Sequence, residues 1–221
     1  MHETGDVWHF GVSGAWREID SAYKGANASL AATSPTYPVG AVFETRPSAR
    51  ARNTAMLVST RRANGGNPIR ANNVRMFNVE MARQCGPFML EGEYTSVFVH
   101  RIQDALSLGN LRFDGWNVQT RYLLTGESHQ YDVRDGNFGA VKPNSSYGAV
   151  EVAARYDFLD LNDKDVRGGS EHDITLGLNW FINQQVRLSA NYLHQVIRPA
   201  NYGSVKRNLD TIGLRCQIRF K

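Results

Sequence analysis

The sequence predicts an all-β fold, an antiparallel transmembrane β-barrel with about nine strands in this chain. Apolar and polar residues alternate along nearly the whole chain, which places them on opposite faces of strands. No apolar run reaches the roughly 18 to 20 residues that a membrane helix needs. No segment has the apolar spacing of an amphipathic helix. We therefore expect a single β domain over residues 1–221.

The first half of the chain contains four expected strands. Residues 7–18 alternate clearly, with tryptophans on one face and polar residues on the other. Residues 42–52 alternate more weakly. Residues 75–85 and 88–101 alternate again, and Gly86-Pro87 between them predicts a tight turn.

The second half is more regular. Residues 111–124 and 148–159 each predict one strand. In residues 172–197, apolar residues stand at every second position on both sides of the polar turn 183–185, which predicts a hairpin with one apolar and one polar face. Residues 209–220 predict the last strand, which ends in an aromatic residue.

Two folds produce such alternation, a soluble sandwich or small barrel and a barrel whose outside meets lipid. Three features favour lipid. Full charges such as Glu91, Arg121 and Arg155 stand near the middle of the polar faces, where a dry protein core does not accept them. Aromatic residues such as Trp116 and Trp180 stand near strand ends on the apolar faces, as at membrane interfaces. Short connections alternate with long ones, as in outer-membrane barrels.

Composition and motifs argue against an enzyme and against a bound cofactor. The acidic stretch DLNDKD at 160–165 lacks the glutamate that closes a calcium loop, so an acidic turn at a strand end is expected. The six histidines have no metal-ligand spacing, and no serine lies in a nucleophile-elbow motif. Cys85 and Cys216 fall on apolar faces and are predicted to be unpaired. The formal charge of +4 is mildly basic, and no nucleic-acid partner is expected.

Four motifs occur in an order that is characteristic of one protein family. They are GPFMLEGEY at 86–94, LTGE at 124–127 with Tyr131 and Gly136-Asn137-Phe138, YGAVEVAARYDFLDLND at 147–163, and ITLGLNWFINQQVRLSANY at 174–192. These motifs resemble the phosphate-selective porins, the bacterial O and P type. The resemblance runs from residue 41 to the C-terminus, and we expect it to include the strand from residue 7. It implies a sixteen-stranded, homotrimeric channel of the bacterial outer membrane, through which phosphate or polyphosphate-like anions diffuse into the periplasm.

The length of the chain departs from that family. Each strand with its connection uses about 25 residues here, so sixteen strands would need about 400 residues. Nine is also an odd number, whereas single-chain bacterial barrels close with an even one. We expect the chain to be the C-terminal half of a porin, without its first strands. MHETGDVWHF has no features of a signal peptide, so either a leader was removed or the chain begins inside a longer one.

Arginines are the candidate anion-binding residues, because a guanidinium stays charged and donates paired hydrogen bonds to phosphate. The candidates are Arg46, Arg50 and Arg52 at even spacing, and Arg61, Arg62 and Arg70 in a long loop over 53–74. Even spacing places the first three on one face, with Thr45 expected to point outward. The resemblance implies an extracellular loop and an arginine ladder that draws anions in. A solvated basic loop and a lipopolysaccharide-binding surface are the alternatives.

The connection 125–147 is unusually long for the side on which strand counting places it. Long loops are usually functional, and the resemblance implies a periplasmic loop folded into the lumen. Lys142 is then a candidate anion contact, Arg134 a weaker one, and Arg121 on the preceding strand a pore-lining residue. Two alternatives remain open, a general or other-anion porin and a non-transporting barrel for adhesion or structure. Expected partners are small anions, outer-membrane lipid with lipopolysaccharide, and further copies of the chain.

Overall fold

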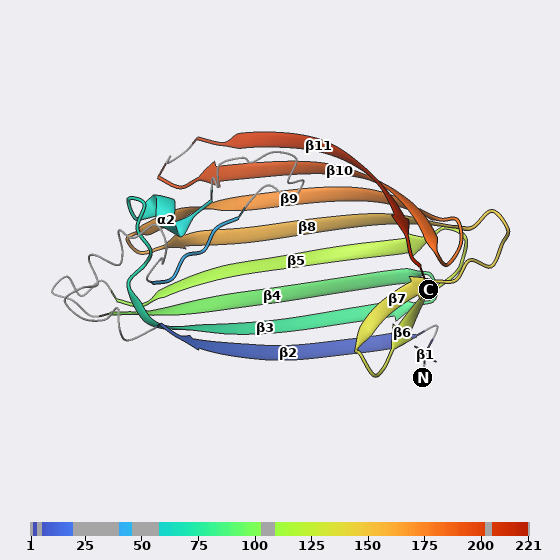
Figure 1. Cartoon of the computed structure of the whole chain (residues 1–221), viewed down its shortest axis with the longest axis horizontal. Coiled ribbons are helices and arrows are strands. Elements are labelled where there is room, and N and C mark those ends of the chain that lie inside the picture. Colours follow the sequence, from blue (N-terminus) through green and yellow to red (C-terminus); the bar gives the residue numbers. More distant parts are fainter. Residues whose placement is uncertain are drawn as a thin grey trace.

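A computed structural model describes residues 2–3, 6–19, 40–45, 58–102, 109–201 and 205–220. Within these residues, eight strands form one twisted antiparallel sheet in the order β2-β3-β4-β5-β8-β9-β10-β11 (Figure 1). Their bounds are Val7–Glu18 (β2), Ala71–Cys85 (β3), Phe88–Arg101 (β4), Leu111–Leu123 (β5), Ala149–Asp163 (β8), Val166–Phe181 (β9), Val186–Pro199 (β10) and Arg207–Ile218 (β11). The predicted all-β antiparallel fold is confirmed.

Three shorter strands form a second small sheet. β1 (His2–Glu3) pairs with β6 (His129–Asp132), and β6 pairs with β7 (Asn137–Val141). β6 and β7 form a hairpin inside the connection between β5 and β8 (Figure 1). We call the end of the large sheet beside this hairpin the turn end, because the tight turns β3–β4 and β9–β10 lie there. The opposite end, with the connections β2–β3 and β10–β11, is the loop end.

The predicted hairpin over 172–197 is formed by β9 and β10. Its register places Leu178 opposite Ala190, Trp180 opposite Leu188 and Leu176 opposite Tyr192. These apolar side chains share one face of the sheet with Phe10 of β2 and Leu214 of β11, and they remain exposed. We call it the outer face. A broad exposed apolar face of alternating origin is the surface that a barrel presents to lipid.

Replacement of Leu178 by arginine tests this orientation. Leu178 is 48 % exposed on the outer face, in the middle of the sheet. The free energy of unfolding in a bilayer should fall by about 2–4 kcal/mol, because an arginine at the membrane midplane must be desolvated. Reversible urea unfolding of the complete barrel in liposomes measures the change. Replacement of the inner-face Thr175 by arginine is the control, and an equal loss from both would contradict the lipid contact.

At the loop end the inner face is apolar and covered by chain. Buried residues of the sheet, including Phe113 and Val99, pack against Val58 and Ile69 of the β2–β3 connection. The ring of Phe43 lies 5.4 Å from the ring of Phe113. Burial of such a side chain contributes about 1.5–3 kcal/mol. Residues 40–45 and 58–70 of the β2–β3 connection therefore fold over the inner face rather than away from the sheet, and we call these two described stretches the covering segment.

This covering segment corrects two predictions. Residues 42–52 were expected to form a strand, but Ala41 and Glu44 make only isolated bridges, and residues 46–52 lie outside the described part. The loop expected over 53–74 contains the short helix α2 (Thr60–Ala63), capped by the Ser59 side chain, and β3 begins within it at Ala71. Packing on the inner face replaced pairing at a sheet edge. The large sheet consequently has eight described strands, an even number, instead of nine.

The 125–147 connection is also more ordered than a plain loop, because β6 and β7 occupy it. A second apolar cluster, Leu123, Val141, Ala149 and Phe181, joins β7 to the inner face at the turn end. The inner face thus has a buried apolar patch at each end and charged residues between them. Within the described residues, no strand pairs with the outer edge of β2 or of β11, and the sheet is not closed.

Some local features follow the sequence closely. Gly86, at φ 53, makes the two-residue β3–β4 turn with Pro87, since a residue without Cβ adopts this conformation readily. Cys85 and Cys216 are both free, as predicted, and both are exposed.

At the loop end, Arg101 donates two hydrogen bonds to Asp165 of the β8–β9 turn and holds the pKa of that carboxyl below its usual value. No helix in the described ranges is both long and apolar enough to span a bilayer.

Candidate functional site: an arginine-lined cavity on the inner face

The middle of the inner face carries acidic side chains, most of which have a partner. Arg121 Nη2 lies 2.5 Å from Glu91 Oε2, and Arg155 Nη2 lies 2.5 Å from Asp157 Oδ1. The first pair joins neighbouring strands, β5 and β4, and the second joins two inner-face residues of β8. The acidic residues of this region therefore do not make the wall uniformly negative.

Two further carboxylates lie close together on β9. Glu171 and Asp173 are buried, and the Gln195 side-chain amide donates to both, at 2.7 and 2.9 Å. The Thr45 side chain also hydrogen-bonds to Glu171. Thr45 was expected to point outward, and this prediction is wrong. It belongs to the covering segment, which places its hydroxyl against the inner face.

The turn end of the inner face carries positive charge. Arg187 of β10 and Arg215 of β11 stand on this face, and Arg219 follows β11 beside them. Among the described residues, no carboxylate oxygen lies within 4.0 Å of a side-chain nitrogen of these three arginines. Arg187 instead donates from Nη2 to Gln217 Oε1 at 2.8 Å. Their positive charge is therefore available to a ligand.

A cavity of about 240 Å³ is lined by two of these arginines, Arg187 and Arg219, and by the β6–β7 hairpin. One wall consists of Arg121, Arg187, Arg219 and Gln217, which come from β5, β10 and the β11 region. The lining also includes His129, Phe138, Gly139 and Val141 of the hairpin, and residues 183–186 at the β9–β10 turn. Guanidinium and amide groups in this arrangement donate hydrogen bonds, so the cavity suits a small oxyanion.

Arg121 contributes a further donor. Its Nε atom is buried and has no hydrogen-bond partner in the described part of the chain, although its Nη2 contacts Glu91. A buried donor without a partner costs about 1–3 kcal/mol. The Arg121 guanidinium is therefore held by Glu91 but is not fully satisfied by the described protein atoms.

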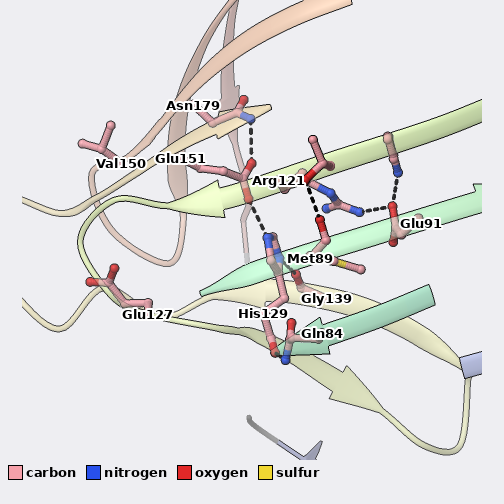
Figure 2. A network of polar contacts seen from close by, with 12 residues as sticks. Gln84, Met89, Glu91, Arg121, Glu127, His129, Gly139, Val150, Glu151 and Asn179 are labelled. Atoms are coloured by element: carbon pink, nitrogen blue, oxygen red, sulfur yellow. Dashed lines mark hydrogen bonds and ion pairs between the residues drawn. The ribbon is translucent and has the colours of Figure 1, made fainter. Parts of the chain in front are cut away.

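Two carboxylates near the hairpin position it. Glu127 lies just before β6 and accepts hydrogen bonds from the Thr125 hydroxyl and from the Asn144 N–H. Burial alone would raise the pKa of the Glu127 carboxyl, but these bonds outweigh it and hold the pKa below its usual value. They tie the beginning of the connection to its end. Glu151 of β8 contacts His129 of β6, as Figure 2 shows.

The predicted arginines fall in three places. Arg46, Arg50 and Arg52 lie outside the described residues. Arg61, half-buried, and Arg62, exposed, lie in α2 on the inner face at the loop end, far along the sheet from the hairpin (Figure 1).

Arg70 is exposed immediately before β3. The structure does not bring Arg61, Arg62 and Arg70 together with Arg121. Their part in anion binding stays a prediction.

The connection 125–147 gives a mixed outcome. Arg121 lines the cavity, as expected for a pore-lining residue. Lys142 is exposed after β7 and does not line it, and Arg134 is exposed in the β6–β7 turn. The described residues contain no group of three or more histidine, cysteine, aspartate or glutamate side chains that could hold a metal ion.

Sequence reasoning missed Arg187, Arg219 and Gln217 as members of one site. One signal was present, because Arg215, Gln217 and Arg219 alternate on the polar face of the last strand. Alternation alone does not show that the adjacent β10 adds Arg187, or that the hairpin covers them.

Comparisons with known proteins agree with this geometry. The family model described as phosphate-selective porin O and P matches residues 1–220. Porin O of Pseudomonas aeruginosa is 28 % identical over 216 residues, which are 87 % of this chain and 44 % of that protein. An uncharacterized protein of Caulobacter vibrioides is 30 % identical over 116 residues, 49 % of this chain and 23 % of its own length. The chain thus spans less than half of the relatives it matches. With an open antiparallel sheet, an apolar outer face and a family match over nearly every residue, the chain belongs to the phosphate-selective porins O and P, which are outer-membrane proteins.

Proposed function

We propose that this chain forms part of the wall of an outer-membrane channel through which phosphate or polyphosphate-like anions diffuse into the periplasm. The observation that carries the proposal is a group of arginines at the turn end that have no carboxylate partner among the described residues, Arg187, Arg215 and Arg219. A channel favours anions when positive charge lines the water path between walls of low dielectric constant. The cavity beside Arg121 is where a passing phosphate would exchange hydration for guanidinium hydrogen bonds.

The remaining parts of the channel are inferred from the same sheet. The apolar outer face needs lipid or protein against it along its whole width, and a complete barrel needs strands beyond β2 and β11. We propose that residues 1–221 are the C-terminal portion of a single porin barrel domain. We also propose that complete barrels associate as homotrimers and that their loop end contacts lipopolysaccharide.

The decisive experiment is competition between chloride and phosphate in single complete channels. Phosphate added to a chloride solution should reduce the chloride current at low concentration, because it occupies the arginine-lined cavity. The double variant Arg187→Ala/Arg219→Ala should raise the half-blocking phosphate concentration by about tenfold or more, since each hydrogen bond to a charged group is worth about 1.5–3 kcal/mol.

The matched control is Arg75→Ala, which removes an exposed arginine from the outer face. Its half-blocking concentration should equal that of the unmodified channel. Equal permeation of chloride and phosphate without block would instead indicate a general or other-anion porin. An absence of conductance from complete barrels would indicate a structural or adhesive role.

A further inference from the structure

A buried polar contact between His129 and Glu151 holds the β6–β7 hairpin to the large sheet. His129 Nε2 lies 2.5 Å from Glu151 Oε2, and His129 Nδ1 lies 3.3 Å from the Gly139 carbonyl oxygen. Gln84 Nε2 donates to the His129 carbonyl at 3.0 Å, and Asn179 Nδ2 donates to Glu151 at 2.8 Å. Figure 2 shows His129 pointing from the hairpin toward Glu151 on β8.

This contact is buried as deeply as a protein core. His129 is 4 % exposed, Glu151 2 % and Gln84 0 %. A carboxylate buried at this depth is strongly destabilising if it loses its partner. The hairpin therefore has one preferred position, because a shift along the sheet would separate Glu151 from the His129 donor and the Gln84 amide from the His129 carbonyl.

The same contact also controls the charge of the cavity wall. Glu151 is close enough to Arg121 and to Arg187 to interact with both electrostatically. While His129 holds Glu151, the carboxylate is turned toward the hairpin. Without His129, the carboxylate would be free to pair with the arginines and reduce the positive charge that an anion meets.

We infer that His129 and Glu151 are a positioning pair, which fixes the hairpin over the arginine-lined cavity and thereby sets the affinity of the channel for phosphate-like anions. The inference rests on the proposed function, because the cavity is taken as an anion site. His129 and Gly139 themselves form part of the cavity lining. Displacement of the hairpin would open this wall to water and weaken the field of the arginines.

The test uses the complete channel and two independent measurements. The first is the half-blocking phosphate concentration in chloride, recorded together with the maximal chloride conductance. The second is the mobility of a nitroxide label at Val133→Cys in the exposed β6–β7 turn, with Cys85→Ser and Cys216→Ser to remove the native thiols. The label reports on the hairpin whether or not the channel binds phosphate.

His129→Ala should raise the half-blocking phosphate concentration by roughly tenfold, a common result of removing the support of a charged site. It should also increase label mobility. His129→Gln should restore most of both values, because its amide nitrogen can replace Nε2 as a donor to Glu151. Glu151→Gln should mobilise the label but weaken phosphate binding less than His129→Ala does, since no free carboxylate remains near the arginines.

The matched control is His194→Ala, which breaks another histidine–carboxylate contact, to Asp210 at 2.8 Å on the outer face. It should change neither measurement. The inference is overturned if His129→Ala leaves the label immobile, or if the label becomes mobile while phosphate block is unchanged. If the unmodified channel shows no phosphate block at all, the proposed function fails, whereas a mobile label in His129→Ala still identifies the positioning pair.

Discussion

The 221-residue chain, produced alone and inserted into planar bilayers, should give no discrete conductance steps. The large sheet has eight described strands, and the outer edges of β2 and β11 have no described neighbour. Each edge exposes a row of backbone donors and acceptors, and each unsatisfied group costs several kcal/mol in hydrocarbon. A monomeric sheet with these edges should not persist as a transmembrane pore.

The control is a complete barrel in which additional porin strands are joined to the same residues. It should insert and conduct in uniform steps, and it should resist unfolding by detergent in unheated gels. Reproducible steps of one size from the 221-residue chain would contradict the prediction, and would mean that the edges find partners in this chain or in a second copy of it.

The second large effect is expected at the three arginines that follow Thr45 in the sequence. In the complete channel, replacing Arg46, Arg50 and Arg52 together by alanine should weaken the preference for anions over cations. These residues follow Thr45, whose hydroxyl contacts Glu171 on the inner face. Arg46, Arg50 and Arg52 themselves lie outside the described residues. We propose that they contribute positive charge to the water path. Such fields raise the local concentration of counter-ions and their rates of entry by about 10- to 1,000-fold.

The salt dependence distinguishes this field from a local contact. The Debye length is about 30 Å at 0.01 M salt and about 3 Å at 1 M, so the triple variant should lose most selectivity at low salt and little at high salt. Reversal potentials in salt gradients measure the permeability ratio. Thr45 cannot act as the outward control, because its side chain faces the inner surface.

Arg83→Ala is the better control, since this arginine stands on the outer face above the Trp8 ring. It should leave the permeability ratio unchanged. If the triple variant keeps both its phosphate block and its permeability ratio at low salt, the three arginines are only a solvated surface.

The fold class was predictable because successive side chains of a strand lie on opposite faces, so the sequence alone shows which residues share a face. Alternation located all eight strands of the large sheet, including the β9–β10 hairpin, although β9 begins at Val166, earlier than the predicted residue 172. The bounds of β2, Val7–Glu18, equal the predicted ones. Outer-face residues such as Leu178 and Trp180 were identified correctly for the same reason. The two unpaired cysteines and the turn at Gly86 also followed from local pattern.

Residues 42–52 show where this rule stops. A weakly alternating segment can pair with a sheet edge or lie over a face, and the choice depends on which apolar surface is available to it. Phe43 packs against Phe113, and Val58 and Ile69 pack against the apolar loop end of the inner face. The burial of these distant residues outweighed strand pairing, and no property of residues 42–52 alone contains that information.

The sequence by itself determined that the protein is a β-sheet with one apolar and one charged face, and that its motifs are those of a porin. Only the tertiary structure decided which arginines meet at one cavity. Arg121, Arg187 and Arg219 are 66 and 32 positions apart in sequence, and they meet because strand order and the covering hairpin bring them to one cavity. Likewise His129 and Glu151 form a contact through the folding of the β5–β8 connection onto the inner face. Charge pairing depends on distances of a few ångströms between strands, and such distances are set by register and packing rather than by the order of residues.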